Sequence, residues 1–185
     1  MQLHVDRLSC RRGGREVYSD LEFRLGGGAV MALRGPNGVG KSTLLRQLAG
    51  LLPVTDGDVA LDGVSLRHDP SAFRERVLYA GHLDAVKPAL TVADNLGLWR
   101  AVMGPGSTDI APVLERFGLA HIAGRPAAEC SAGQKRRLGL ARLMLVPRPL
   151  WLLDEPTVSL DSEGTALVAS MIEAHASAGG IAIVA

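Results

Sequence analysis

The stretch Gly35–Thr43 has the sequence GPNGVGKST and matches the pattern G-x-x-x-x-G-K-[ST] at every fixed position. A short apolar run precedes it and leucines at helical spacing follow it, which places it between a predicted strand and a predicted helix. Glycines let the backbone curl so that successive N–H groups point at one anion, and the helix N-terminus adds partial positive charge. An ordinary glycine-rich turn is the alternative, but the complete pattern in this frame favours a nucleoside triphosphate site.

Within this loop the residue types suggest separate roles. Lys41 is expected to reach the β- and γ-phosphates, and the Ser42 hydroxyl is expected to bind Mg²⁺. The loop alone does not separate a kinase, a GTPase and a transport ATPase. The expected nucleotide contacts are Gly35, Pro36, Asn37, Gly38, Val39, Gly40, Lys41, Ser42 and Thr43.

Two acids follow an apolar run in WLLDEP, Trp151–Pro156. The run predicts a buried strand, and ligands of open α/β sheets bind at the carboxyl ends of strands. Asp154 is therefore an expected partner of Mg²⁺, directly or through water, beside Ser42. Glu155 is expected to polarise an attacking water as general base, a function that a small-molecule kinase would not need. The alternative is a strand that ends in two solvated carboxylates.

The remaining pattern predicts a mixed α/β chain. Period-two apolar patterns at Leu3–Ser9 and Val17–Leu25 predict antiparallel strands, and GGGAVMALRG predicts a buried strand before the loop. Leu44, Leu45, Leu48 and Leu51 predict the following helix. The other expected strands lie in 57–66, 77–81, 149–156 (PLWLLDEP, ending in the two acids) and 180–185. The other expected helices cover Val92–Met103, Ile110–Phe117 and 164–179, and the helix from Val92 has a capping-box-like start at Thr91 and Asp94.

The totals of the chain narrow the class of function. Its net charge is +1, so bulk electrostatics does not predict a nucleic-acid partner. The two cysteines, Cys10 and Cys130, are typical of reduced thiols rather than of a disulfide framework. The N-terminus carries no apolar signal region, and no apolar run reaches the roughly 18 residues that span a bilayer. Any action at a membrane is therefore expected to depend on a partner.

The segment ECSAGQKRR, Glu129–Arg137, predicts the start of a helix. Ser131 and Gln134 have the spacing of a capping box, in which each side chain accepts a hydrogen bond from the backbone N–H of the other residue. The question is whether the segment only begins a helix or also forms half of a nucleotide site.

The motifs GPNGVGKST, CSAGQKRR, LLDEP and SLD occur in the order found in ATP-binding cassette (ABC) ATPases, and the chain resembles that family over essentially its whole length. The resemblance implies an α/β P-loop NTPase fold with a mainly parallel core sheet, an N-terminal antiparallel β-subdomain and an inserted helical subdomain. It implies one ATP-binding domain over 1–185, with the core in 1–84 and 131–185 and the helical subdomain at about 85–130. It also implies ATP and Mg²⁺ as cofactors.

In this family two cassettes face each other head to tail, so a second cassette, here in a homodimer, is an expected partner. The resemblance implies that Ser131, Ala132, Gly133 and Gln134 present a helix N-terminus to the γ-phosphate held by the other chain. Asp161 of SLD resembles the aspartate that crosses the same interface. Each cassette alone would then hold ATP with only part of the catalytic apparatus.

The sequence departs from the family pattern at four places. Ala132 stands where glycine is usual, and the extra methyl group is tolerable if that residue is already helical. His82 stands where the family usually has a glutamine that links Mg²⁺ and the attacking water to the helical subdomain. A neutral histidine could bind the metal or form a hydrogen bond there, and the alternative is a loop histidine that faces solvent. Arg12 occupies the position of the adenine-stacking aromatic and could stack or be solvated. The chain stops at GIAIVA, before the family's switch histidine, which suggests a fragment or a truncated product.

Further details resemble the ATP-binding subunit of the haem exporter-type complex of cytochrome c maturation. These are LSCRRGGR, YAGHLDAVKPALTVADNL and SAGQKRRLGLARL. The resemblance implies membrane permease subunits as partners, a peripheral location on the cytoplasmic side of the bacterial inner membrane, no nucleic-acid partner, and haem that is handled by the partners. The alternatives are an ATP-gated assembly module with little turnover and a soluble, non-transport ABC ATPase.

Overall fold

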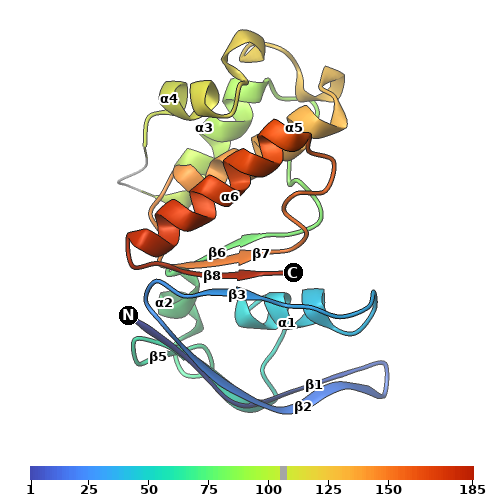
Figure 1. Ribbon diagram of the computed structural model, residues 1–185, viewed down its shortest axis with the longest axis vertical. Helices are drawn as coiled ribbons and strands as arrows, with labels where there is room; N and C mark the ends of the chain where they lie inside the picture. Colours follow the sequence, from blue (N-terminus) through green and yellow to red (C-terminus); the bar gives the residue numbers. More distant parts are fainter. Residues whose placement is uncertain (105–107) are drawn as a thin grey trace. The chain divides into compact units, whose positions relative to one another are not determined.

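The computed structural model describes residues 1–104 and 108–185 (Figure 1). They cluster into two compact units. The first unit contains Met1–Gly81, Arg148–Glu155 and Ile172–Ala185, and the second contains His82–Pro147 and Pro156–Met171. Helix α6 (Ser162–Ser177) runs from the second unit into the first. The expected subdomain boundaries at about residues 85 and 130 stay predictions.

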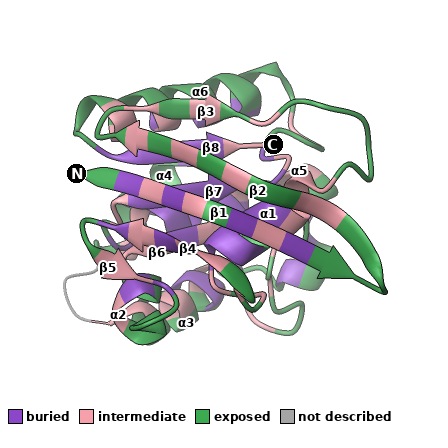
Figure 2. Cartoon of the chain, turned by 90° about the horizontal axis from the view of Figure 1, so that it is seen from below, coloured by how far each residue is buried: buried purple, intermediate pink, exposed green. Residues whose placement is uncertain are grey.

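The first unit contains the predicted antiparallel sheet. Its strand order is β2 (Arg15–Gly26), β1 (Gln2–Arg12), β4 (Asp56–Leu61) and β5 (Val64–Ser65). Leu3 pairs with Leu25, and Val5 pairs with Phe23. Along β1 buried residues alternate with more exposed ones, as Figure 2 shows, because successive side chains point to opposite faces. One face of this sheet therefore covers a core, as the period-two pattern predicted.

The same unit contains a parallel sheet with the order β3 (Val30–Ala32), β8 (Ile181–Val184), β7 (Leu150–Leu153) and β6 (Val77–Ala80). All three strand pairs are parallel, as the resemblance implied. Strand β7 is buried along its whole length because it has a neighbour on each side. The expectation of a buried β3 is wrong. Val30 is 50% exposed, because β3 lies at the sheet edge and, among the described residues, has β8 as its single neighbouring strand.

Helix α1 (Lys41–Leu48) lies between these two sheets (Figure 1). Its apolar stripe of Leu44, Leu45 and Leu48 joins a core that also includes side chains of both sheets and Phe73 of α2 (Pro70–Arg74). Full burial stabilises the fold by about 1.5–3 kcal/mol per leucine. The predicted stripe extended too far, since the helix ends at Leu48 and Leu51 is 59% exposed.

The second unit is helical. Its first helix α3 (Val92–Met103) begins where predicted, and the Thr91 hydroxyl caps it by accepting a hydrogen bond from the Asp94 N–H at 3.0 Å. The Arg142 guanidinium lies 4.7 Å from the centre of the Trp99 ring in a cation–π contact. The further elements are α4 (Ile110–Arg116), α5 (Ala132–Ala141) and three short 3₁₀ helices, η1 (Ala120–Ile122), η2 (Ala127–Glu129) and η3 (Arg142–Met144).

Candidate nucleotide site

The loop between β3 and α1 has the backbone that its glycines predicted. Gly35, Gly38 and Gly40 have φ angles of 145°, 83° and 111°, which side-chain-bearing residues rarely adopt. At Gly40 the surroundings also require glycine, because an added Cβ would lie 2.5 Å from Cγ1 of Val17 on β2. Val17 is thus a neighbour of the loop that the sequence pattern did not identify.

The loop can accept an anion. Gly40 is the N-cap of α1, and no side chain among the described residues caps that helix, so its first-turn N–H groups have no side-chain acceptor. The Lys41 ammonium donates to the carbonyl oxygens of Gly35 at 2.7 Å and Pro36 at 3.1 Å. A cavity of about 260 Å³ lies here, and its lining residues are Val17, Asn37, Gly38, Gly40, Lys41, Ser42, Thr43 and Glu155. Backbone N–H groups and a cation around one cavity fit a polyphosphate.

The serine of the loop and the first acid of WLLDEP meet in space. The Ser42 hydroxyl donates a hydrogen bond of 2.9 Å to Oδ1 of Asp154, across 112 residues of sequence. Asp154 follows β7 directly and is 2% exposed. A hydroxyl and a carboxylate are hard oxygen donors of the kind that Mg²⁺ binds. This pair therefore fits the predicted metal ion.

Two residues that sequence reasoning missed support Asp154. The Tyr79 hydroxyl on β6 donates to Oδ2 of Asp154 at 3.4 Å, and Nε of Arg46 on α1 donates to the Tyr79 oxygen at 3.4 Å. Burial raises the pKa of Tyr79, so its hydroxyl stays protonated at neutral pH and can serve as a donor. The available signal was a tyrosine in the strand beside β7, in register with Leu152.

The second acid, Glu155, has an unusual backbone. Its φ of 49° lies in the left-handed region, which costs about 1–2 kcal/mol for a residue with a side chain. Its N–H donates to the carbonyl oxygen of Ala185 at 3.1 Å. In this conformation Glu155 lines the same cavity as Lys41 and Ser42. A carboxylate there can accept a proton from a water, and residues in strained backbone cluster at functional sites.

Two other predicted site residues lie elsewhere. Arg12 is exposed and lines a different cavity of about 260 Å³, together with Cys10, Gln47 and Thr55. It is absent from the described lining of the phosphate-loop cavity. His82 is exposed and begins the second unit, two residues after the end of β6. Their roles beside the nucleotide stay predictions.

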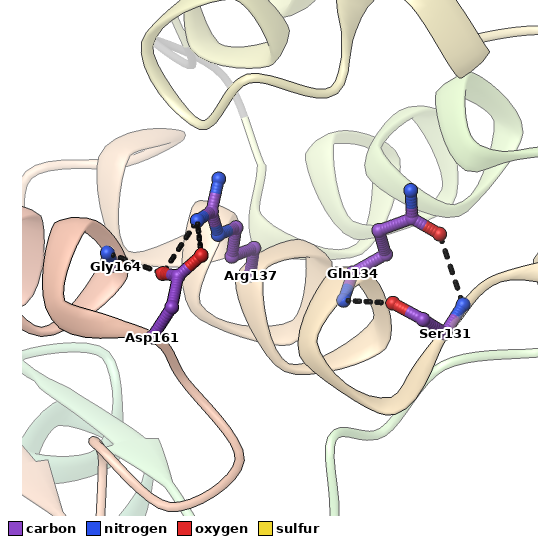
Figure 3. A network of polar contacts seen from close by, with 5 residues as sticks. All are labelled: Ser131, Gln134, Arg137, Asp161 and Gly164. Atoms are coloured by element: carbon purple, nitrogen blue, oxygen red, sulfur yellow. Dashed lines mark hydrogen bonds and ion pairs between the residues drawn. The ribbon is translucent and has the colours of Figure 1, made fainter.

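The predicted capping box at the start of α5 is confirmed (Figure 3). The Ser131 N–H donates to Oε1 of Gln134 at 2.9 Å, and the Gln134 N–H donates to Oγ of Ser131 at 3.2 Å. Since Oγ only accepts in this bond, the hydroxyl proton of Ser131 can still be donated to a phosphate. Ala132 is the first helical residue and is exposed, which meets the condition under which its extra methyl group was expected to be tolerable. Gly133 has less room, because a Cβ there would lie 3.0 Å from the Ser159 carbonyl oxygen.

Asp161 is held beside this helix by Arg137, a residue to which the sequence motifs assigned no role of its own. Arg137 of α5 donates from one nitrogen to both Asp161 oxygens, at 2.7 and 2.9 Å, and the Gly164 N–H donates to Oδ1 at 2.8 Å (Figure 3). The bond from Gly164, followed by those from Arg137, lowers the pKa of Asp161. The sequence signal that could have drawn attention to Arg137 was its position one helical turn after Gln134.

Comparison with known proteins decides the family. The model of the ABC transporter family matches residues 18–158, which include the phosphate loop Gly35–Thr43, the segment Glu129–Arg137 (the signature segment) and the acid pair. The chain belongs to the ABC transporter family. It is a nucleotide-binding ATPase of that family. It is 48% identical to the cytochrome c biogenesis ATP-binding export protein CcmA of Nitrobacter winogradskyi, over 100% of this chain and 91% of the relative. It is 49% identical to the CcmA of Paracoccus denitrificans, over 99% of this chain and 81% of that protein.

Solved structures agree with the fold. An ATP-binding subunit of an ABC transporter, 26% identical, matches with a TM-score of 0.88 over 100% of this chain and 79% of its own. A dimeric ATP-binding cassette in a post-hydrolysis state with ADP and phosphate is 21% identical and matches with a TM-score of 0.85, over 98% of this chain and 86% of its own. The predicted fold class is therefore confirmed. Within residues 1–104 and 108–185, none of the helices has the length and apolar character needed to cross a membrane.

Proposed function

We propose that the chain is the ATP-hydrolysing subunit of a membrane complex for cytochrome c maturation, of the haem exporter type. Two cassettes would sandwich ATP at the cytoplasmic side of the bacterial inner membrane, bound there through permease subunits that handle the haem. The observation that carries the ATPase site is the 2.9 Å bond from Ser42 to Asp154, beside the cavity that Ser42 and Glu155 both line. The 48% identity to a CcmA protein supports the branch.

The residues of the loop would bind and orient the nucleotide. Lys41 would exchange its two carbonyl acceptors for the β- and γ-phosphates, which accept a stronger, charge-assisted bond. Ser42 and Asp154 would hold Mg²⁺, with Tyr79 fixing the second Asp154 oxygen. When bound, Mg²⁺ supplies positive charge that offsets the charge developing on the phosphate oxygens.

Hydrolysis would need groups from both cassettes. Glu155 would hold the attacking water and accept its proton, and His82 would take the place of the usual glutamine beside that water. The partner's signature helix would present its N-terminus and the Ser131 hydroxyl to the γ-phosphate, where negative charge is favoured. Asp161, held against α5 by Arg137, would lie at the same interface.

The test is Glu155→Gln in the complete complex purified from membranes. We expect ATP affinity within about threefold of the wild type, hydrolysis slowed at least 10²-fold by loss of the base, and no cytochrome c formation. Glu173→Gln, at an exposed position of α6, is the matched control and should behave as the wild type. Undiminished turnover in Glu155→Gln would exclude Glu155 as the base. Failure to co-purify membrane subunits, or their lack of haem absorbance, would refute the assignment to this complex.

A further inference from the structure

Arg136 is a buried cation in α5, the helix that begins in the signature segment, and it has no role in the site described above. It is 4% exposed, although arginine is seldom fully buried unless it is paired. It lies one residue before Arg137, and consecutive residues of a helix point about 100° apart. Arg137 contacts Asp161, whereas Arg136 points to two other segments of the second unit.

The Arg136 side chain bonds groups of two other segments in the second unit. Nε donates to the carbonyl oxygen of Pro156 at 3.3 Å, and one terminal nitrogen donates to the carbonyl oxygen of His82 at 3.5 Å. The same nitrogen lies 3.1 Å from Oδ1 of Asp84, whose side chain is 27% exposed and provides the counter-charge. We call these four residues the Arg136 bridge. It connects α5 to the segment after β6 and to the segment after the acid pair.

The contact between α5 and the Asp84 segment is close at the backbone as well. Gly139, one turn beyond Arg136, is buried, and an added Cβ there would lie 2.6 Å from the Asp84 carbonyl oxygen. The Asp84 segment is therefore held against α5 by the hydrogen bonds of the Arg136 side chain and by close backbone packing at Gly139. A planar guanidinium can bond several acceptors in fixed directions, whereas a lysine ammonium is a compact charge.

The connected segments carry the proposed catalytic groups. Pro156 directly follows Glu155, the proposed base, and His82 is the proposed substitute for the usual glutamine. The N-terminus of α5 is the part that the proposed dimer presents to the partner's nucleotide. We propose that Arg136 is a positioning residue that couples the two ATP sites: it transmits the engagement of Ser131 with one nucleotide to the segments that act on the other. This inference rests on the proposed roles of Ser131 and Glu155.

The first measurement uses Arg136→Lys in the full chain. This substitution keeps the positive charge opposite Asp84 but removes the planar guanidinium and its several directed N–H donors. We expect ATP affinity within threefold of the wild type, because the phosphate loop belongs to the other unit. We expect single-turnover hydrolysis to fall about 10–100-fold, the cost of misplacing groups by about 1 Å. Arg116→Lys, an exposed position at the end of α4 in the same unit, is the control and should retain wild-type rates.

The second measurement separates coupling from a merely structural role. If Arg136 transmits the contact made by Ser131, the double variant Arg136→Lys with Ser131→Ala should be no more than twofold slower than the slower single variant. Multiplicative effects of the two substitutions would overturn the proposal, because independent sites add in free energy. Wild-type turnover in a folded Arg136→Lys variant would overturn it as well.

If Arg136→Lys does not fold, Asp84→Asn takes its place in both measurements. The amide oxygen of the new asparagine can still accept a hydrogen bond from Arg136, but its negative charge is lost. We therefore expect a smaller fall in the rate of single-turnover hydrolysis, about 3–10-fold. Wild-type turnover in Asp84→Asn would then refute the proposal. Glu155→Gln is measured in parallel. Normal turnover in Glu155→Gln would mean that the proposed role of Glu155 as the base has failed. If Glu155→Gln has lost turnover but the Arg136 and Asp84 variants hydrolyse ATP at the wild-type rate, only the Arg136 inference is wrong.

Discussion

Replacing Gly40 by alanine tests whether the phosphate loop depends on its contact with β2. Gly40 has a φ of 111°, a conformation that costs a residue with a side chain about 1–3 kcal/mol. The new Cβ would also lie 2.5 Å from Cγ1 of Val17, and relieving such overpacking costs typically 1–3 kcal/mol. Gly40→Ala should therefore lower the free energy of unfolding by about 2–6 kcal/mol and prevent ATP binding, because the first N–H groups of α1 would be displaced.

The assay is urea denaturation of four proteins: the wild type, Gly40→Ala, Val17→Ala and the double variant. Removing the Val17 methyl groups relieves the overlap but leaves the backbone strain. We therefore expect the double variant to be about 1–3 kcal/mol more stable than the sum of the single effects. Gly13→Ala is the matched control, since Gly13 also has a positive φ, 55°, but no atom lies within 4 Å of an added Cβ. It should lose only about 1–2 kcal/mol.

Additive effects of Gly40→Ala and Val17→Ala, within about 0.5 kcal/mol, would refute the reasoning. They would mean that Val17 does not restrict the loop in solution. A Gly40→Ala variant that binds ATP normally would contradict the second part, that the left-handed backbone is needed to direct the N–H groups at phosphate.

Three further outcomes are expected. Ser42→Ala should raise the Mg²⁺ concentration for half-maximal hydrolysis by roughly 10–100-fold and leave metal-free nucleotide binding unchanged; an unchanged Mg²⁺ titration would contradict the Ser42–Asp154 site. Ser131→Ala should lose the helix cap, about 0.5–2 kcal/mol in denaturation, whereas Ser131→Asp should keep the cap but repel the phosphate, so normal hydrolysis by Ser131→Asp would exclude the signature contact. Burial lowers the pKa of His175 below 6.5, so the unfolded chain binds the proton more tightly and stability should fall as pH drops from about 7 through the folded pKa. His175→Phe should retain the stack on Trp151, whose ring centre lies 4.0 Å away, and should flatten that pH dependence; an unaltered pH profile of the melting temperature would exclude His175 as its source.

Features that depend on local chemistry could be predicted from the sequence. The positive φ angles at Gly38 and Gly40 follow from the loop pattern, and the capping box follows from the spacing of Ser131 and Gln134. The meeting of Ser42 and Asp154 required one additional rule, that the carboxyl ends of parallel strands share an edge where ligands bind.

Features that depend on packing between distant segments could not be predicted in this way. Tyr79 reaches Asp154 because β6 lies beside β7, and the sequence of neither strand specifies which strand it pairs with. The exposure of β3 depends on its place at the sheet edge, whereas an apolar run looks the same at an edge and in the centre. Arg136 and Arg137 are adjacent in sequence, and only the orientation of α5 separates their partners.

The left-handed backbone at Glu155 has a consequence for attempts to improve this protein. Glycine or asparagine suits a φ of 49° better than glutamate does, so a search for thermostable variants would favour replacing Glu155. The same replacement would remove the carboxylate from the nucleotide cavity. Stability and turnover are thus expected to be opposed at one position, as in other active sites where function needs a strained conformation. Directed evolution that selects for heat resistance alone should therefore recover inactive cassettes with substitutions at this residue.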